Sequence, residues 1–303
     1  MIRKLALLVA LAAIAGGLAF WFLSAPKTLD AETLAALPEG DAARGEMVFW
    51  AGGCESCHAA DGAEGDEKLM LGGGHVLASD FGDFVVPNIS TDEQHGIGAW
   101  SKEDFANAVL RGVSPDGAHF YPSFPYTSYA RMSDQDLADL WAFMQTLPAV
   151  DNDPGPHKLG FPFNVRRGVG LWKLLYAGEG WIEEIDGADE KLLRGRYLVE
   201  GLGHCGECHT PRDFAGGLKR DMWLAGAPNP DGKGRIPNIT PGGTIADWSE
   251  TDIAYYLESG FTPDFDSVGG SMVDVQENMA KLPAEDREAI AAYLKAIPAH
   301  QSE

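Results

Sequence analysis

The sequence is poor in cysteine and in positive charge. Its 303 residues include only 4 Cys, and 23 Lys and Arg stand against 45 Asp and Glu, giving a formal net charge of −22. A surface this acidic excludes a nucleic-acid partner, because binding to phosphates requires a basic face. It fits docking to a partner of complementary charge, and it equally fits acidity that serves only solubility.

Sequence patterns of common enzyme classes are missing as well. The chain has no nucleotide-binding loop, no pattern typical of a catalytic triad and no carboxylate dyad, so we do not expect it to be an enzyme on its own. No stretch shows the sustained alternation of apolar and polar residues that a β-sheet requires. The chain reads instead as helices joined by loops rich in its 37 Gly and 18 Pro, which predicts an all-α fold.

One long apolar run is present near the start, from Leu5 to Leu23. At 1.5 Å per residue its about 19 residues reach roughly 28 Å, close to the thickness of a bilayer core. Arg3 and Lys4 precede the run and would stay in the cytoplasm, which places the rest of the chain on the other side. We therefore predict a transmembrane anchor over residues 1–25.

A cleaved signal peptide is the alternative for this segment. Its small-residue site would fall at Ser24 and Ala25, but Pro26 follows directly and would hinder cleavage. The run is also longer than the core of a typical signal peptide. We favour a retained anchor with a single pass through the inner membrane, followed by a linker over 26–41. Both interpretations place the folded part in the periplasm.

The few cysteines form two copies of one pattern. Each copy reads C-x-x-C-H, which is the attachment signature of c-type haem. Two thiols three positions apart can both form thioethers to one porphyrin, and the adjoining His can supply an imidazole nitrogen to the iron. The sequence therefore predicts two covalently bound haem c groups, held by Cys54, Cys57, His58, Cys205, Cys208 and His209.

Other uses of this pattern fit less well. A structural zinc ion needs four ligands, and each copy offers two thiolates and one imidazole. A thioredoxin-like motif would not require a trailing His twice. Structural disulfides are possible in an oxidising compartment, but thiols three positions apart close only a short loop and so stabilise little.

The two patterns lie inside a wider duplication with a period near 150 residues, the kind of repeat that defines an architecture. We predict one domain over 42–150 and a second over 191–303, called here the first and second halves. The repeated pairs are Arg44-Gly45 with Arg194-Gly195, Pro87–Ser90 with Pro237–Thr240, Trp100-Ser101 with Trp248-Ser249, Asp104 with Asp252, Gly112 with Gly260, and Leu147-Pro148 with Ile297-Pro298.

Helices are expected at matching places in both halves. Short helices over 44–51 and 193–201 would deliver the two haem motifs. Ser133 and Asp136 resemble a capping box. The apolar residues after it recur at i, i+3, i+4 and i+7, which places them on one helix face. They are Leu137, Leu140, Trp141 and Met144, and the second half repeats the spacing at Ile290, Tyr293, Leu294 and Ile297.

Between the halves, residues 151–190 form a connector. It contains three Pro, but Trp172 and Leu174 are among several apolar residues that make it unlike a free linker. We expect it to dock against one or both halves and to fix their separation.

Six stretches after the anchor carry a family resemblance. The chain resembles the membrane-anchored multihaem cytochrome c subunits of periplasmic alcohol, gluconate and related dehydrogenases, and it is most similar to their dihaem relatives. This resemblance implies two tandem cytochrome c-like domains; the alcohol dehydrogenase type carries three haems. The matching stretches are VPNIS from Val86, GIGAWS from Gly96, GVSPDG from Gly112, YPSFPY from Tyr121, FPFN from Phe161 and GHCGECHTPR from Gly203.

The resemblance also implies a second axial ligand on each iron. Met272 stands at the family's ligand position in the second half, in a loop before the closing helix, and Met279 is its rival. In the first half Phe124 stands where many relatives have Met. Met132 is then the nearest candidate, with a hydrophobic-staple role as the alternative. His119 is a further candidate, and an open sixth site is also conceivable.

Further residues are expected to support the haems. By resemblance to c-type cytochromes, the carbonyls of Pro87 and Pro237 would accept hydrogen bonds from the free ring N–H groups of the two motif histidines. Arg212 would either neutralise a propionate or lie on the surface. Trp100 and Trp248 would either line the haem pockets or simply pack in the core.

The resemblance implies transfer of single electrons from a periplasmic dehydrogenase subunit to an acceptor of the respiratory chain. In such a protein the cofactor carries the chemistry, and the chain supplies ligands, burial and spacing. The alternatives are a dihaem peroxidase-like enzyme, which requires one open iron site, and a docked cytochrome subunit of a terminal oxidase.

Overall fold

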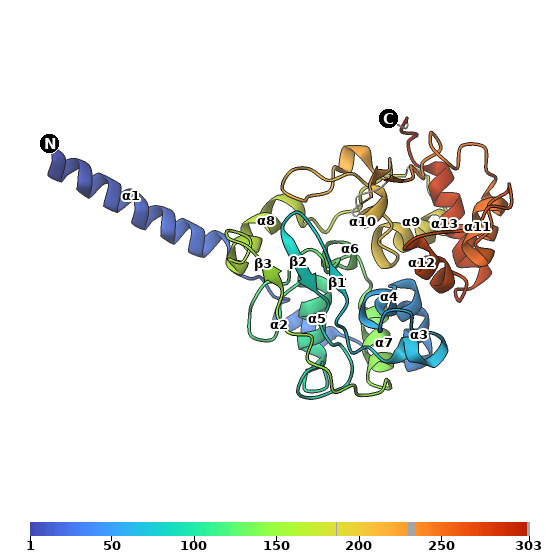
Figure 1. Ribbon diagram of the computed structural model, residues 1–303, viewed down its shortest axis with the longest axis horizontal. Helices are drawn as coiled ribbons and strands as arrows, with labels where there is room; N and C mark the ends of the chain where they lie inside the picture. The colour runs from blue at the N-terminus through green and yellow to red at the C-terminus, as the bar shows by residue number, and fades with distance from the viewer. Residues whose placement is uncertain (186, 230–233, 302–303) are drawn as a thin grey trace.

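The computed structural model describes residues 1–185, 187–229 and 234–301. The chain is mostly helical, which confirms the all-α prediction (Figure 1). Helix α1 (Ile2–Leu23) stands clear of the folded body, and none of its side chains is buried. With a mean hydropathy of 2.4 it has the length and composition of a membrane span, a test that a signal sequence also passes.

The first half is organised around two closely packed helices, α3 (Ala42–Ala51) and α7 (Asp134–Met144). Their close approach depends on Gly45, because a Cβ atom there would lie 1.9 Å from the carbonyl oxygen of Asp139. The other helical elements of this half are α4 (Cys54–His58), the 3-10 helix η1 (Gly65–Leu69), α5 (Lys102–Arg111) and α6 (Tyr126–Tyr129), and α2 (Ala31–Ala36) lies before it, in the linker.

The second half repeats this arrangement with α9 (Glu190–Arg196) and α13 (Ala284–Ala296). Gly195 takes the place of Gly45, and a Cβ atom on it would lie 2.0 Å from the carbonyl oxygen of Ala289. The other helical elements are the π-helical turn η3 (Tyr197–Leu202), α10 (Gly206–His209), the 3-10 helix η4 (Arg220–Met222), α11 (Glu250–Ser259) and α12 (Met272–Met279).

Helix starts also match between the halves. Ser101 forms a complete capping box with Asp104 at α5, and Ser249 does so with Asp252 at α11. The expected box at α7 is only half formed. Ser133 accepts from the backbone of Asp136 at 3.1 Å, but the Asp136 carboxylate instead accepts a hydrogen bond from the Tyr197 hydroxyl in the other half.

Two small antiparallel sheets are present that the sequence did not predict. Their strands have only two to four residues, too few for the alternation of side chains to stand out. One sheet has the order β1 (Val76–Leu77), β2 (Gly82–Val85), β3 (Lys158–Leu159), and the other pairs β4 (Ala227–Pro228) with β5 (Arg235–Ile236).

The connector contacts both halves. Its strand β3 pairs with β2 of the first half, and the Trp172 indole donates to the carbonyl of Ala215 at 3.0 Å in the second. It also contains η2 (Arg166–Gly168) and α8 (Val169–Tyr176), and α8 lies beside the body end of α1 (Figure 1). The boundaries at 150 and 190 stay predictions.

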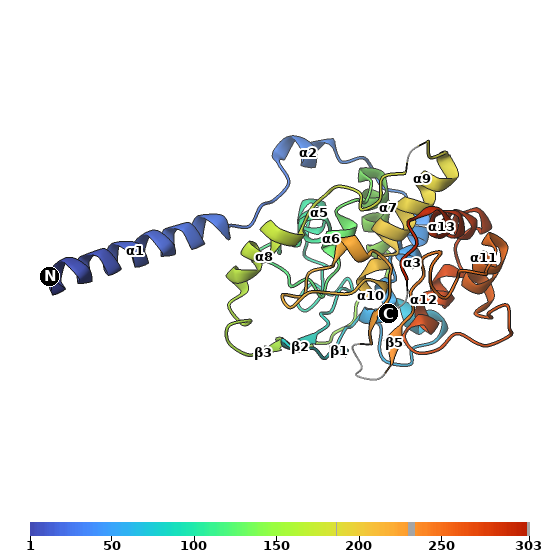
Figure 2. The ribbon, with the colours of Figure 1, turned by 90° about the horizontal axis from the view of Figure 1, so that it is seen from above.

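The two halves share one continuous apolar core. Buried Leu137 and Met144 of the first half belong to the same cluster as Leu198 and Tyr293 of the second. Helix α12 lies against α3, so the second half rests directly on the helix that leads into the first C-x-x-C-H motif (Figure 2).

Candidate haem sites

Each motif histidine is oriented by a prolyl carbonyl. Nδ1 of His58 lies 2.8 Å from the carbonyl oxygen of Pro87, and Nδ1 of His209 lies 2.8 Å from that of Pro237. A carbonyl can only accept, so Nδ1 carries the proton and Nε2 keeps its lone pair. These contacts confirm the predicted roles of the two prolines.

Burial keeps both imidazoles neutral. Loss of solvation lowers the pKa of His58 to about 4, with the prolyl carbonyl opposing the shift, and it lowers the pKa of His209 in the same way. A neutral imidazole with a free Nε2 is the form that can bind iron. The donor set of each motif therefore fits an axially ligated haem.

The four motif thiols are unbridged. Cys54 and Cys205 lie at the starts of short helical turns, and desolvation raises the pKa of each thiol to about 12. No disulfide consumes them, unlike the structural alternative raised from the sequence. Within residues 1–185, 187–229 and 234–301, no group of three His, Cys, Asp or Glu side chains is arranged to hold a metal ion, as a zinc site would require.

The loop after each motif folds back on its histidine. The backbone N–H of Gly73 donates to the carbonyl of His58 at 2.8 Å, and that of Gly226 donates to the carbonyl of His209 at 2.7 Å. Both glycines have positive φ angles, 66° and 84°, which disfavour other residues. Sequence reasoning missed this pair, although each Gly stands at a similar distance after its motif.

A large buried ring packs against the second motif. A Cβ atom on Gly206 would lie 1.9 Å from the ring of Trp223, which is 1% exposed, so glycine is required between the two cysteines. The first motif has Glu55 at the matching position, with its carboxylate buried. The two motifs share their chemistry but have different neighbours.

The candidate sixth ligands occupy different kinds of position. Met272 is the first residue of α12 and is partly buried against the core, whereas Met279 ends the same helix and is 5% exposed. Phe124 takes the place of Met272 in the first half and contacts the rings of Phe120, Tyr126 and Tyr129. Ligation by Met272 stays a prediction.

Met132 lies in the apolar core at 6% exposure. It stands two residues before the first residue of α7, and Leu282 stands two residues before the first residue of α13. Because Leu has no atom that can bind iron, this place in the fold is not reserved for a ligand. The comparison favours the packing role, and ligation by Met132 stays a prediction.

His119 is engaged elsewhere. Its Nε2 lies 2.9 Å from the carbonyl oxygen of Ser24, directly after α1, and the ring is 2% exposed. This contact occupies Nε2, whereas Nδ1 is buried without a hydrogen-bond partner among the described residues, and ligation by His119 stays a prediction. His119 therefore ties the anchor helix to the body.

The first motif is bonded to the second half. The Asn278 amide on α12 donates to the Glu55 carboxylate and to the Ser56 hydroxyl, both at 3.0 Å. Glu55 is 3% exposed, and this burial raises its pKa, while the Asn278 hydrogen bond opposes the shift. The segment between Cys54 and Cys57 is thus fixed by a residue more than 200 positions away.

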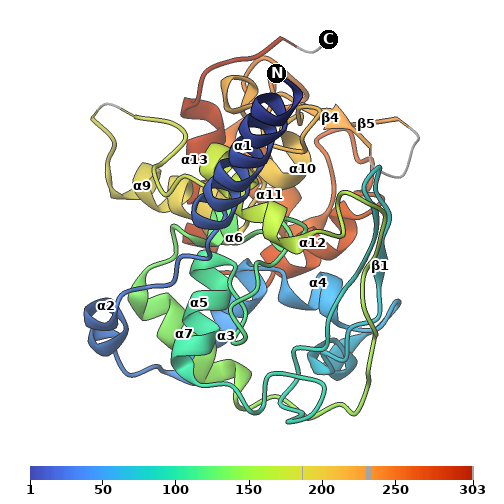
Figure 3. The ribbon, with the colours of Figure 1, turned by 90° about the vertical axis from the view of Figure 1, so that its left-hand side faces the viewer.

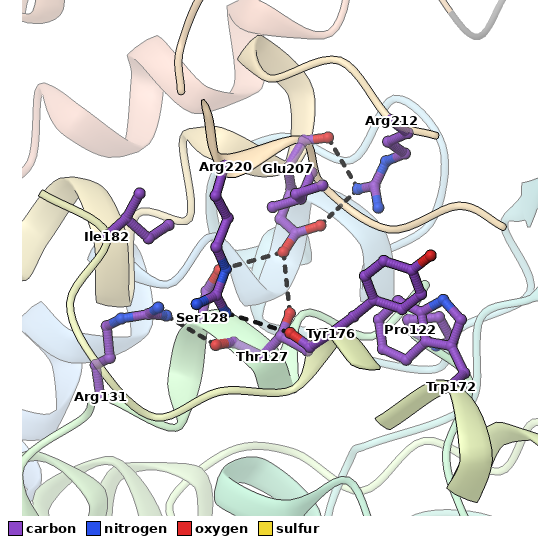
Figure 4. Close-up of a pocket in the computed structure, with 11 residues that line it drawn as sticks. Pro122, Thr127, Ser128, Arg131, Trp172, Tyr176, Ile182, Glu207, Arg212 and Arg220 are labelled. Carbon is purple, nitrogen blue, oxygen red and sulfur yellow. Dashed lines mark hydrogen bonds and ion pairs between the residues drawn. The ribbon is translucent and has the colours of Figure 1, made fainter. Parts of the chain in front are cut away.

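The second motif is bonded in turn to the first half. Thr127 and Ser128, on α6, donate to the Glu207 carboxylate at 3.2 Å each, and Figure 4 shows Arg212 on its other side. Arg212 pairs with Glu207 at 2.5 Å and lies partly exposed, which favours the surface role over the propionate role. These residues line a small cavity between the halves and the connector.

Tyr129 lies between the two motifs. Its hydroxyl donates to the carbonyl of Gly52, two residues before Cys54, at 2.7 Å. Its ring lies 5.6 Å from the ring of His204, the residue before Cys205. Tyr129 therefore contacts both haem-attachment segments. Together with Glu55 and Glu207, which each accept hydrogen bonds from the opposite half, it brings these segments to one interface.

A buried arginine joins the halves to the connector. Arg131 donates from Nε and Nη2 to the carbonyl of Gly180, at 3.1 and 2.7 Å, and its Nε lies 3.9 Å from the Glu200 carboxylate. Glu200 is fully buried and accepts from the Tyr293 hydroxyl at 2.7 Å. Such a network stabilises one arrangement of the halves, because removing any partner leaves a buried charge.

Comparison with known proteins places this geometry in a family. The family model for cytochrome c matches residues 42–148. A diheme cytochrome c-type protein of Cereibacter sphaeroides is 58% identical over 297 residues, which cover 98% of this chain and 99% of that protein.

Two dehydrogenase subunits are more distant relatives. The fructose dehydrogenase cytochrome subunit of Gluconobacter japonicus is 36% identical over 84% of this chain, and the gluconate 2-dehydrogenase cytochrome c subunit of Pantoea cypripedii is 34% identical over 84%. The aligned regions cover 52% and 59% of those proteins, so this chain spans little more than half of their length. All three relatives are named as cytochromes or cytochrome subunits, in agreement with the prediction that this chain is not an enzyme on its own. The chain belongs to the dihaem c-type cytochromes.

Proposed function

We propose that this chain is a membrane-anchored cytochrome that takes single electrons from a periplasmic dehydrogenase subunit and passes them towards a respiratory acceptor. The observation that carries the proposal is the pair of C-x-x-C-H motifs, each with an oriented neutral imidazole, bonded to each other's half. Relatives named as cytochrome subunits of fructose and gluconate dehydrogenases support a dehydrogenase as the partner.

Different residues of the chain would hold different parts of the two haems. The two cysteine pairs would form the thioethers, and His58 and His209 would bind the irons through Nε2. Met272 would complete the second site. When bound, each haem supplies reversible one-electron chemistry at a potential set by its ligands and surroundings. Pro87 and Pro237 hold the imidazole rings through their carbonyls.

Each half makes hydrogen bonds to the haem-attachment segment of the other half, and these bonds fix the spacing of the two segments. Asn278 holds the first segment from the second half, and Ser128 holds the second segment from the first half. Neither segment can move away without losing hydrogen bonds of the other half. A fixed spacing suits electron exchange inside one chain, because it requires no movement of domains.

The junction with α1 supports a retained anchor. Ser24 has no exposed surface, and its carbonyl and hydroxyl are bonded to His119 and Arg167. A peptidase acting at Ser24 and Ala25 would have to extract this segment from the folded body. We infer a single pass through the inner membrane, with both haem-binding halves in the periplasm.

Purification of the intact complex from membranes in mild detergent tests the proposal. We expect a dehydrogenase subunit to co-purify, and the substrate of that enzyme to reduce the bound cytochrome. Co-purification with a copper-containing oxidase would instead favour the oxidase alternative. Peroxide turnover by the purified chain would favour the peroxidase-like alternative, for which Phe124 in place of a ligand is the supporting observation.

A further inference from the structure

One part of the connector, residues 154–178, differs in charge from the rest of the chain. Residues 154–178 contain no Asp or Glu but include Lys158, Arg166, Arg167 and Lys173, in a chain whose net charge is −22. Lys158 is exposed. Lys173 is turned inward, where it donates to the carbonyl of Arg111 at 2.7 Å. The exposed charge of residues 154–178 is therefore basic and is carried by Lys158, on an otherwise acidic molecule.

The same segment exposes large apolar side chains. Phe161 is 84% exposed and Leu175 is 77% exposed, although both belong to ordered parts of the connector. Phe214, at 97%, stands on a neighbouring loop that Trp172 of α8 holds by a hydrogen bond to Ala215. We call this surface the apolar rim, and it consists of Phe161, Phe163, Val165, Leu174, Leu175 and Phe214.

The rim is rigidly joined to the end of the anchor helix. Arg167 donates to the carbonyl of Trp21 at 2.6 Å and to the Ser24 hydroxyl at 3.0 Å, and its guanidinium lies 4.3 Å from the Trp21 ring centroid. Gly170 of α8 lies so close to Ser24 that a Cβ atom there would be 2.4 Å from the Ser24 carbonyl oxygen. Figure 1 shows α1 leaving the body beside α8, and Figure 3 views the molecule from the side on which α1 leaves it.

We propose that the apolar rim lies in the headgroup region of the same membrane that α1 crosses, with an anionic phospholipid surface as its partner. Side chains such as Phe161 and Leu175 would enter the boundary between headgroups and acyl chains, and exposed Lys158 would face the phosphates. A surface with exposed apolar groups, basic charge and a trans-bilayer helix attached to it combines both forces that hold interfacial segments.

The consequence is a fixed orientation of the periplasmic body. A chain held only by α1 could tilt freely on its anchor, whereas contact through the rim adds a second point of attachment. The two haem motifs would then keep a constant height above the membrane, where a membrane-bound donor or acceptor can reach them. This inference rests on the proposed anchoring by α1, and the test below separates the two.

Photocrosslinking of the full haem-loaded chain in nanodiscs of phosphatidylcholine and phosphatidylglycerol tests the inference. The photoreactive residue p-benzoylphenylalanine replaces Phe161 or Leu175, one position at a time. Leu11, inside α1, serves as the control for insertion, and Phe265, an 85% exposed aromatic residue of the second half, serves as the control for exposure. Mass spectrometry of the peptides measures the fraction crosslinked to lipid.

We expect lipid crosslinks at positions 11, 161 and 175, with yields at 161 and 175 at least about tenfold above that at 265. A yield at 161 and 175 no greater than at 265, with strong crosslinking at 11, would overturn the rim contact and leave the anchor intact. Absence of crosslinks at 11 would overturn the anchor itself. Crosslinks from 161 to another copy of the chain would assign the rim to self-association and contradict the inference.

Discussion

The two halves of the molecule have the same framework but different segments before the closing helix. Capping boxes, glycine contacts and histidine–proline hydrogen bonds occur at matching positions. In the first half the segment before α7 contains the four residues of α6, and in the second the segment before α13 contains the eight residues of α12. Both segments donate hydrogen bonds to the opposite motif. The framework therefore holds a haem motif, and the variable segment adapts each half to the other.

One matched pair of positions illustrates the difference. Arg131 and Lys281 each stand three residues before the first residue of their closing helix. Arg131 is buried against Gly180 and Glu200, while Lys281 is exposed and lies over the ring of Trp50 at 4.2 Å. The same position is thus a buried support for the interface in one half and a surface contact in the other.

The largest effect is expected when one motif loses both thiols. Replacing Cys54 and Cys57 together by Ala should remove one covalent haem, because no other thiol lies in that half. The matched variant with Cys205 and Cys208 replaced should lose the other. Mass spectrometry of the intact chain checks this directly. Retention of two covalent haems by either variant would contradict the assignment of one haem to each motif.

The next largest effect is expected at Arg131, where a substitution should destabilise the fold more than one at its counterpart Lys281. Arg131→Ala leaves the buried Glu200 carboxylate without its cation, and breaking a buried pair in this way costs about 3–5 kcal/mol of unfolding free energy. Lys281→Ala removes an exposed cation–π contact worth about 0.5–1 kcal/mol. Urea unfolding followed by tryptophan fluorescence measures both. Equal losses would show that the two positions do not differ as the structure indicates.

Met272→Ala tests the sixth ligand of the second half. Loss of a thioether ligand should lower the potential of one haem by on the order of 0.1 V, well inside the roughly 0.8 V that axial ligands span. Met279→Ala is the matched comparison, since Met279 ends the same helix and is buried in the core. Spectroelectrochemical titration should resolve the shift. If Met279→Ala lowers the potential and Met272→Ala does not, the two assignments must be exchanged.

The hydrogen bonds that each half makes to the opposite motif should contribute differently to the unfolding free energy. Asn278→Ala leaves the buried Glu55 without its amide donor, at a cost of about 1–3 kcal/mol in unfolding free energy. Ser128→Ala should cost less, about 0.5–1.5 kcal/mol, because Glu207 is partly exposed, unlike Glu55, and keeps Thr127 and Arg212 as donors. Thermal unfolding of the haem-loaded chain compares the two. A larger loss for Ser128→Ala would reverse the expected order.

The smallest effect is expected at Met132. Met132→Leu keeps an apolar side chain of similar volume where the second half has Leu282, so stability should change by less than about 1.5 kcal/mol and the visible spectrum should not change. A lower potential or a high-spin iron in this variant would instead establish Met132 as the ligand that the sequence suggested.

Much of the scaffold could be predicted from the sequence, because its signals are local or repeated. The apolar spacing after Ser133 indicated α7, and the resemblance to c-type cytochromes, carried by motifs that occur twice, implied that the carbonyls of Pro87 and Pro237 orient the histidines. These features depend on a few neighbouring residues or on a pattern that occurs twice. The apolar run from Leu5 to Leu23 likewise indicated helix α1.

The contacts between the halves could not be predicted in the same way. Asn278 reaches Glu55 across 223 positions, and neither residue type indicates the other as its partner. The Asp136 carboxylate accepts a hydrogen bond from the Tyr197 hydroxyl and does not complete the capping box of its own helix, because the tertiary partner outweighs the local one. His119 was considered as an iron ligand, but its bond to Ser24 depends on where α1 enters the body.

The central claim is that each half binds one haem through its own C-x-x-C-H motif. Peptide mapping by mass spectrometry, on full-length chain made together with a haem-maturation system, tests it most directly. We predict one haem on the peptide with Cys54 and Cys57 and one on the peptide with Cys205 and Cys208. Free or mutually bridged thiols in either peptide of the exported chain would contradict the account.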